Sequence, residues 1–296
     1  MNTSQSAVGH IDHAQILKVA ASIGVLGKGA HSAPRIMAAL CNPAIDGREV
    51  GALVGREPGL YARVLRVANS AFYGQSQSVT TIERALQLLG LDAVRGIAAA
   101  ACLDRTVLRG GAQSLVDLRA VVQHSQATAL AAEALARLSH RTLASEAFIA
   151  GLLHNLGIPV QSHLDPAGIK AMIDLRRGGD TRDMSVLEAE RAAVGHEECI
   201  AVIFREWQLP ESLIAATRHH HDPLAAAEPY RPLASLISLG AALASAGGSA
   251  HVLDPSPGAP SAAALSCLGL SAEQFDDVGR ELPARVAELQ RALQDP

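Results

Sequence analysis

The sequence has few aromatic residues and no excess of basic charge, and each shortage excludes a kind of protein. Aromatic residues make up 3% of the 296 positions. A core without them must be built from small and straight-chain side chains, which lose little rotamer freedom in a helix. The formal net charge of −4 offers no electrostatic footprint for a polyphosphate backbone, so we expect no nucleic acid among the partners.

Cysteines are also few, and no two of them are close in the chain. The four, at Cys41, Cys102, Cys199 and Cys267, form no CxxC pair, which is typical of buried thiols in a reducing compartment. The N-terminus has no apolar run between a basic start and a cleavage site. Residues 232–250 are uncharged, but their serines and glycines make them too polar to span a membrane. We therefore expect a cytoplasmic, soluble chain with no membrane partner.

Familiar catalytic motifs are missing as well. The sequence has no GxSxG elbow, no GxxxxGKS/T phosphate loop and no HExxH helix. What it does have is apolar residues, 49% of the chain against 18% charged, which is typical of a globular protein. Because alanine and leucine dominate and recur at helical spacing, we expect an all-α fold.

Start and stop signals mark several helices in the first half. Asp46 and Glu49 have the spacing of a capping box, in which each side chain accepts a hydrogen bond from the other residue's backbone amide. A later helix should stop at Gly90, because glycine permits a positive φ. Long helices are predicted over residues 91–108 and 114–140.

Two stretches in the first half have a specific pattern. The first reads LRVANSAFYG and the second reads TIERALQLLGLDAVRGIA. Together they resemble the HDOD family, the HD-related output domain of bacterial signalling proteins. The matching residues are Leu65, Arg66, Val67, Ala68, Asn69, Ser70, Phe72, Tyr73, Gly74, Ile82, Ala85, Leu89, Gly90 and Leu91. The resemblance runs from about residue 33 to about residue 223, and implies a helical module followed by a helical domain similar to the HD phosphohydrolases.

A glycine pair suggests where these two parts divide. Residues 109–111, Arg-Gly-Gly, are the predicted hinge. We expect the N-terminal helical module of the HDOD domain over residues 1–110 and an HD-like helical domain over residues 111–246. Residues 247–296 are predicted to form a flexible loop, followed by two short C-terminal capping helices with little apolar surface.

The stretch AFIAGLLHNLGIPV, residues 147–160, is the one around which we interpret the rest of the chain. Its apolar residues predict a buried helix, so His154 and Asn155 should point into the fold, where a polar pair needs partners. Other histidines are candidates to meet this pair. The candidate metal-ligand set is His124, His154, His196, His220 and His221. Histidines expected at the surface are His10, His13, His31, His140, His163 and His251.

The HDOD resemblance implies how the set would work, because in HD-type enzymes equivalent histidines and a His-Asp pair hold one or two divalent ions. Here Asn155 follows His154, where those enzymes have the aspartate that bridges the metals. An amide offers one neutral oxygen instead of two charged ones, so we expect no working dinuclear centre. Four imidazoles still suit a single zinc ion. The other interpretation is that the histidines are hydrogen-bonded polar residues left in a vestigial cleft.

His220 and His221 are adjacent, which limits how they can act together. On a regular helix of roughly 3.6 residues per turn, neighbouring side chains point about 100° apart. Both can reach one site only if the helix ends before them, as Pro223 indicates.

We therefore predict a catalytically inactive HDOD module that acts in bacterial signal transduction by binding other signalling proteins or by forming a homo-oligomer. This role requires no cofactor, although a single divalent metal such as zinc is compatible with the histidines. The alternative is a metal-dependent phosphohydrolase acting on a substrate such as a cyclic dinucleotide. Against it stand Asn155 and the absence of the GYP text that follows the paired histidines in the HD-GYP phosphodiesterases. Nucleic-acid binding is a third hypothesis and would require a basic face.

Overall fold

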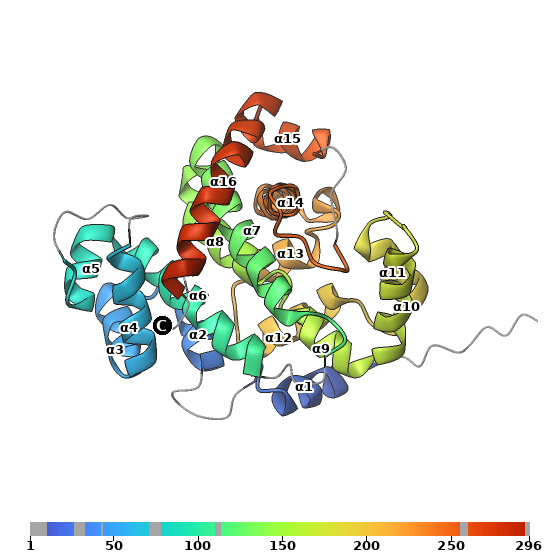
Figure 1. The fold of residues 1–296 in the computed structure, drawn as a ribbon, viewed down its shortest axis with the longest axis horizontal. Coiled ribbons are helices and arrows are strands. Elements are labelled where there is room, and N and C mark those ends of the chain that lie inside the picture. Colours follow the sequence, from blue (N-terminus) through green and yellow to red (C-terminus); the bar gives the residue numbers. More distant parts are fainter. Residues whose placement is uncertain are drawn as a thin grey trace, which may run out of the picture.

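The computed structural model describes residues 11–26, 33–42, 44–70, 78–109, 114–254 and 260–293. Every regular element in these segments is a helix, apart from an isolated antiparallel β-bridge between His251 and Asp254 (Figure 1). The predicted all-α fold is confirmed.

The helices follow one another along the whole described chain. The first part contains α1 (His13–Ser22), α2 (Ala33–Cys41), α3 (Gly47–Gly55), α4 (Pro58–Ala68), α5 (Ile82–Leu89) and α6 (Leu91–Arg109). The middle part contains α7 (Leu118–Ser139), the 3-10 helix η1 (Arg141–Leu143), α8 (Ala144–Leu153), α9 (Gly157–Leu164), α10 (Pro166–Arg177), α11 (Met184–Arg191), α12 (His196–Glu206) and α13 (Glu211–Arg218). The last part contains η2 (Pro223–Ala225), η3 (Glu228–Tyr230), α14 (Arg231–Ala246), α15 (Ala262–Leu268) and α16 (Ala272–Leu293).

The helix signals in the sequence are confirmed. The Asp46 side chain accepts from the Glu49 amide at 2.8 Å, and the Glu49 side chain accepts from the Asp46 amide at 3.0 Å, so α3 begins with the capping box. α5 ends at Gly90, whose φ of 85° suits glycine. The two long predicted helices are α6 and α7. α7 begins at Leu118 rather than at residue 114, because Asp117 caps its first turn.

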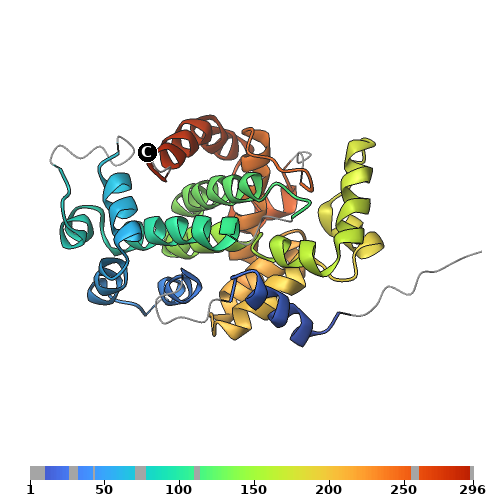
Figure 2. The same cartoon turned by 60° about the horizontal axis from the view of Figure 1, so that its bottom comes forward.

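α7 lies at the centre of the second half, between α8 and α14, with α16 packed across it (Figure 1 and Figure 2). Small residues let these helices approach one another closely. A Cβ added to Gly151 of α8 would lie 3.0 Å from Ala129 Cα of α7, and one added to Gly240 of α14 would lie 2.9 Å from the Thr128 carbonyl oxygen. These close contacts bring together the helices that carry the candidate site.

The run Arg141–Leu164, which covers η1, α8 and α9, is long and apolar enough by composition to cross a membrane. It is the one such run in the segments that the structure describes. In the fold, 78% of its most apolar window is buried inside the protein, so its composition is that of a core helix. This burial confirms that the stretch around His154 lies in the interior.

The C-terminal region differs from its prediction. α16 is one helix, not two, although Pro283 lies inside it and proline normally interrupts helical hydrogen bonding. A buried apolar face runs along its length, at Phe275, Leu282, Val286, Leu289 and Leu293. The expectation of little apolar surface there is therefore wrong. α16 contacts α7, α4 and α14, and its apolar residues are buried on both sides of the proline.

Some predictions fall outside the described segments. These are the hinge glycines Gly110 and Gly111, the motif residues Phe72, Tyr73 and Gly74, and the predicted surface residues His10 and His31. The domain boundaries therefore stay a prediction. α1, which belongs to the predicted first module, contacts α9 and α12 of the predicted second domain. Within the first motif, Asn69 binds both backbone groups of Val79, donating to its carbonyl at 2.8 Å and accepting from its amide at 2.7 Å. This residue thus ties the end of α4 to the chain that leads into α5.

Candidate metal centre

The five histidines of the predicted set lie together in the core. His154, directly after α8, has its ring centroid 5.3 Å from that of His124 on α7 and 4.9 Å from that of His220. The His220 ring in turn lies 5.2 Å from His196 and 4.2 Å from His221. None of the first four residues is more than 3% exposed, and the His221 side chain is 10% exposed.

Helix ends place three of these side chains. α13 ends at Arg218, so His220 and His221 follow it in irregular backbone, and both contact the ring of His196. The sequence predicts that both side chains can reach one site only if the helix ends before them, and it does. His196 is the first residue of α12. A Cβ added to Gly157, at the start of α9, would lie only 2.0 Å from the His196 carbonyl oxygen. Only glycine permits this approach.

All five rings share one hydrogen-bonding pattern. In each of them Nδ1 lies near an oxygen that can only accept, so Nδ1 carries the proton and donates. The acceptors are the Ser249 carbonyl for His124 (3.0 Å), the Gly151 carbonyl for His154 (2.7 Å), the Glu188 carboxylate for His196 (2.8 Å), the Thr217 carbonyl for His220 (2.7 Å) and the Asp183 carboxylate for His221 (3.1 Å). The nitrogen that remains available on each ring is Nε2. Histidines that bind metals are oriented in this way.

Glu188 of α11 holds the most elaborate of these contacts. Its carboxylate is buried and accepts from His196 Nδ1, from the His196 backbone amide at 3.1 Å and from Gln161 Nε2 at 2.7 Å. Burial alone would raise the pKa of Glu188, but attraction and hydrogen bonding to His196 outweigh it and lower the pKa. Glu188 is therefore ionised and fixes the orientation of His196.

Burial also sets the charge of the rings. It holds the pKa values of His154 and His220 well below 6.5, with neighbouring imidazoles adding to the effect. Burial alone would also lower the pKa of His221, but the hydrogen bond to Asp183 outweighs it and raises this pKa to about 9. At neutral pH the metal-free cluster thus carries positive charge on His221, while His154 and His220 are in the neutral form that binds metals.

The available nitrogens fit a divalent metal. The Nε2 atoms of His196 and His220 are 3.4 Å apart, and one ligand atom from each of His196, His220 and His221 lies within 4.8 Å of the others. His221 Nε2 is buried and has no hydrogen-bond partner among the described residues. These nitrogens converge closely enough to hold a cation once His221 gives up its second proton, and imidazole nitrogen favours an ion of the zinc class. An ion bound here would act as a Lewis acid.

Asn155 does not fit the role of a bridging ligand. It is buried next to His154, and its Nδ2 lies 3.3 Å from Nε2 of His251. The prediction that His251 is a surface residue is wrong, since it is 4% exposed and its ring centroid lies 5.0 Å from that of His124. The amide is therefore engaged with a sixth histidine of the cluster.

The segment that carries His251, where the glycine, serine and proline content predicts a flexible loop, packs against the fold. Leu253 is buried, and its carbonyl oxygen accepts from Arg176 Nε at 3.1 Å and from Arg176 Nη2 at 2.8 Å. The Ser249 carbonyl accepts from His124. Residues 249–254 thus pack against the histidine cluster, and only residues 255–259 of the predicted loop lie outside the described chain.

The comparisons with known proteins agree with this architecture. Residues 26–223 match the HDOD domain model, so the chain belongs to the HDOD domain family, and the resemblance inferred from the sequence is confirmed. An uncharacterized protein of Treponema pallidum (strain Nichols) is 28% identical over 205 residues. That alignment covers 69% of this chain but spans only 39% of the length of the relative.

Solved structures show the same fold. A candidate signal transduction protein from Marinobacter aquaeolei VT8 is 26% identical, with a TM-score of 0.72 over 99% of this chain and 69% of that chain. An HDOD domain protein with unknown function from Geobacter sulfurreducens has a TM-score of 0.69 and 20% identity, over 95% of this chain and 96% of that one. A candidate phosphohydrolase from Shewanella amazonensis SB2B has a TM-score of 0.67 and 23% identity, over 95% and 98%.

Proposed function

We propose that this chain is a non-hydrolytic, metal-binding HDOD module that works in bacterial signal transduction through contacts with other signalling proteins. The observation that carries the proposal is the environment of Asn155, which is buried beside His154 with its amide against His251. HD-type hydrolases have a bridging carboxylate at this position. A neutral amide neither bridges two divalent ions nor offsets their charge, and uncompensated buried charge is costly.

The enclosure of the cluster supports the same proposal. His124, His154 and Asn155 are buried, and residues 249–254 pack against them. On this side of the cluster, a phosphodiester would have to displace the segment, together with its hydrogen bonds to Arg176 and His124, before it met the rings. The arrangement suits a site that holds an ion and keeps substrate out.

A role in signalling is supported by the relative from Marinobacter aquaeolei VT8, which is a candidate signal transduction protein.

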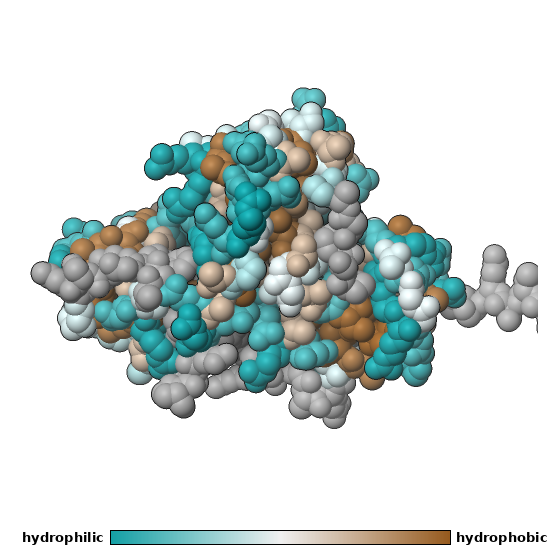
Figure 3. All heavy atoms as spheres, turned by 45° about the horizontal axis from the view of Figure 1, so that its top comes forward, coloured by the Kyte–Doolittle hydropathy of each residue, from teal (hydrophilic) through white to brown (hydrophobic). Residues whose placement is uncertain are grey.

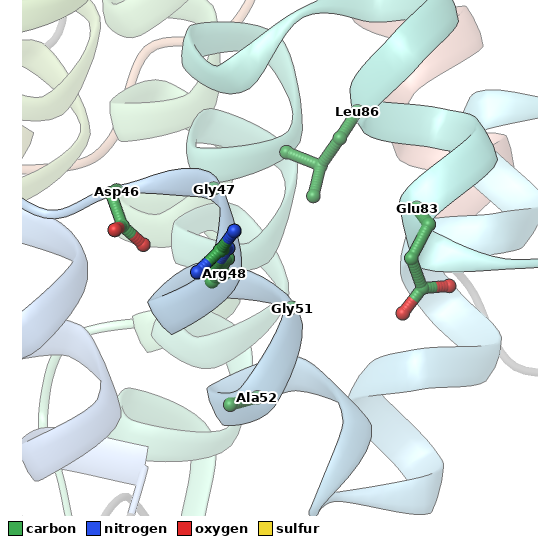
Figure 4. Close-up of a pocket in the computed structure, with 7 residues that line it drawn as sticks. All are labelled: Asp46, Gly47, Arg48, Gly51, Ala52, Glu83 and Leu86. Carbon is green, nitrogen blue, oxygen red and sulfur yellow. The ribbon is translucent and has the colours of Figure 1, made fainter.

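On the face that Figure 3 shows, the hydrophobic colours form separate areas among hydrophilic residues instead of one continuous patch. An open hollow of about 630 Å³ lies between α3 and α5, where Arg48 and Glu83 place opposite charges around Leu86 (Figure 4). It is a candidate contact area for a signalling protein or a second copy of the chain.

A hydrolysis assay tests the proposal. The purified chain is loaded in turn with zinc, manganese and magnesium and mixed with bis(p-nitrophenyl) phosphate and with a cyclic dinucleotide. We expect no turnover above that of the His154→Ala variant. The matched control is His13→Ala, which removes an exposed imidazole that contacts Glu198 of α12 but is not one of the clustered rings. Turnover that survives His13→Ala and is lost in His154→Ala would overturn the proposal.

The second candidate function is a metal-dependent phosphohydrolase. It is favoured by the convergence of the Nε2 atoms, because a metal held by imidazoles can activate water. Asn155 and the enclosure by residues 249–254 count against it. The same assay separates the two functions.

A further inference from the structure

A second group of metal-ligand side chains lies beside the first. His124, His251 and Asp254 each have one ligand atom within 4.8 Å of the others. The rings of His124 and His251 meet edge to face, with centroids 5.0 Å apart and an interplanar angle of 84°. His251 and Asp254 both lie beyond residue 223, where the match to the HDOD domain ends.

Two ring nitrogens in this group lack partners. His124 Nε2 and His251 Nδ1 are buried, and neither has a hydrogen bond within the described part of the chain. The nearest carboxylate oxygen to His124 Nε2, on Asp254, is 3.9 Å away, which is too far for a hydrogen bond. Buried polar atoms in folded proteins almost always have a partner, and a ligand bound beside the carboxylate would satisfy both of these nitrogens.

The hydrogen bond at Nδ1 fixes the lone pair of His124, whereas the lone pair of His251 depends on the orientation of the Asn155 amide. His124 Nδ1 donates to the Ser249 carbonyl, so His124 Nε2 is unprotonated. The Asn155 amide lies on Nε2 of His251. With the amide turned so that Oδ1 accepts from Nε2–H, Nδ1 of His251 carries the lone pair, and the two amide orientations occupy the same space. Asn155 is then a positioning residue for His251.

We propose that His124, His251 and Asp254 bind a divalent cation of the zinc class through two imidazole nitrogens and one carboxylate oxygen. Two nitrogen ligands favour zinc over magnesium or calcium. The Asp254 side chain is 27% exposed, so the ion can exchange with solvent and keep a water ligand on that side. Asp254 would neutralise one of the two charges of this ion.

Such an ion would fasten residues 249–254 onto α7. The segment is held now by His124 at Ser249 and by Arg176 at Leu253, and the ion would add His251 between these points and Asp254 directly after them. Metal occupancy would thereby control how firmly the segment covers the histidine cluster. This inference holds whether or not the chain hydrolyses a phosphodiester.

Zinc stoichiometry tests the site. The full chain is stripped with a chelator and dialysed against zinc, and bound metal is measured for wild type and for Asp254→Asn, a partly exposed and isosteric change. We expect the variant to lose one zinc per chain, or to bind it about 10-fold more weakly or worse. The matched control Asp174→Asn removes an exposed carboxylate of α10 and should keep the wild-type stoichiometry. Equal melting of the chelated proteins shows that each variant is folded.

Hydrogen exchange supplies a second readout. Zinc should slow backbone exchange in residues 249–254 of the wild type and leave it unchanged in Asp254→Asn. His251→Ala should lose the same ion as Asp254→Asn, whereas His221→Ala should keep it. Equal zinc binding by wild type and Asp254→Asn, or no zinc binding by the wild type, would overturn the proposal. Neither outcome depends on a hydrolysis assay, so it is separate from the test of the proposed function.

Discussion

Asn155 Nδ2 and His251 Nε2 lie 3.3 Å apart across 96 residues of sequence. The contact joins the position at which HD-type hydrolases have a bridging carboxylate to a segment outside the residues that match the HDOD domain. The Asn155 amide is therefore part of the histidine cluster, and its neighbour there is the ring of His251.

Replacing Asn155 with aspartate should strengthen metal binding. A carboxylate among neutral imidazoles supplies both charge and a ligand oxygen, so Asn155→Asp should raise the affinity for zinc or manganese by about 10-fold or more. Isothermal titration of the stripped protein measures the change. The control Gln87→Glu adds the same charge on the exposed face of α5 and should have no effect. An unchanged affinity in Asn155→Asp would show that residue 155 does not face the ion.

Glu188 should act as a positioning residue for His196. Glu188→Gln keeps an oxygen for His196 Nδ1 but removes the charge that makes the imidazole a stronger ligand, so zinc affinity should fall by about 10- to 100-fold. Competition with a coloured chelator measures this loss. Glu190→Gln, on the same helix and exposed, is the control and should bind zinc like the wild type. If both variants bind equally well, Glu188 has only a structural role.

Gly157→Ala should destabilise the fold, because the new Cβ would lie 2.0 Å from the His196 carbonyl oxygen. The backbones of α9 and α12 would have to move apart, at a cost of about 3 kcal/mol. Gly51→Ala is the control, since its Cβ would only touch Leu86 at 4.0 Å, and it should stabilise α3 by about 0.5–1 kcal/mol. Urea unfolding measures both. A Gly157→Ala change within about 0.5 kcal/mol of wild type would contradict the close approach.

The metal-free protein should be most stable near pH 6.5. The pKa values of His154, His220 and His251 are well below 6.5 because of burial, so the unfolded chain binds more protons on acidification and stability falls below that pH. The pKa of His221 is raised to about 9, so its contribution is complete below pH 6.5 and is lost as the pH rises through 9. Each proton changes the free energy of unfolding by up to about 1.4 kcal/mol per pH unit.

Urea unfolding in chelator at about pH 5, 6.5 and 9 checks this dependence. Asp183→Asn removes the partner of His221 and should abolish the loss of stability on the alkaline side, leaving the acid side unchanged. A free energy of unfolding that does not fall between pH 6.5 and about pH 5 would contradict the burial of neutral rings.

Much of the fold and part of the site could be predicted from the sequence. The capping box at Asp46 and the stop at Gly90 are local patterns, and each is present in the structure. The five histidines could be grouped because a family resemblance relates their positions, and the end of α13 before His220 follows from nearby proline. Local sequence patterns thus suffice to predict features, such as helix starts and ends, that are formed by residues close together in the chain.

The rest of the site depends on contacts that no local pattern reports. His251 and Asp254 follow a helix in a segment rich in glycine, serine and proline. This composition predicts a loop but not which residues the loop covers. Glu188 is a buried acid whose partners, Gln161 and His196, are placed by the packing of three different helices. In sequences of this kind, acidic residues and histidines outside the motifs should therefore be considered as candidate members of the site.

The most direct test of the account is anomalous X-ray scattering at the zinc edge from crystals of the zinc-loaded chain. We expect a peak contacted by Nε2 of His196, His220 and His221, with Nδ1 of each ring still bound to its oxygen and Asn155 outside the ligand sphere. Absence of that peak, or a pair of ions bridged by the Asn155 side chain, would contradict it.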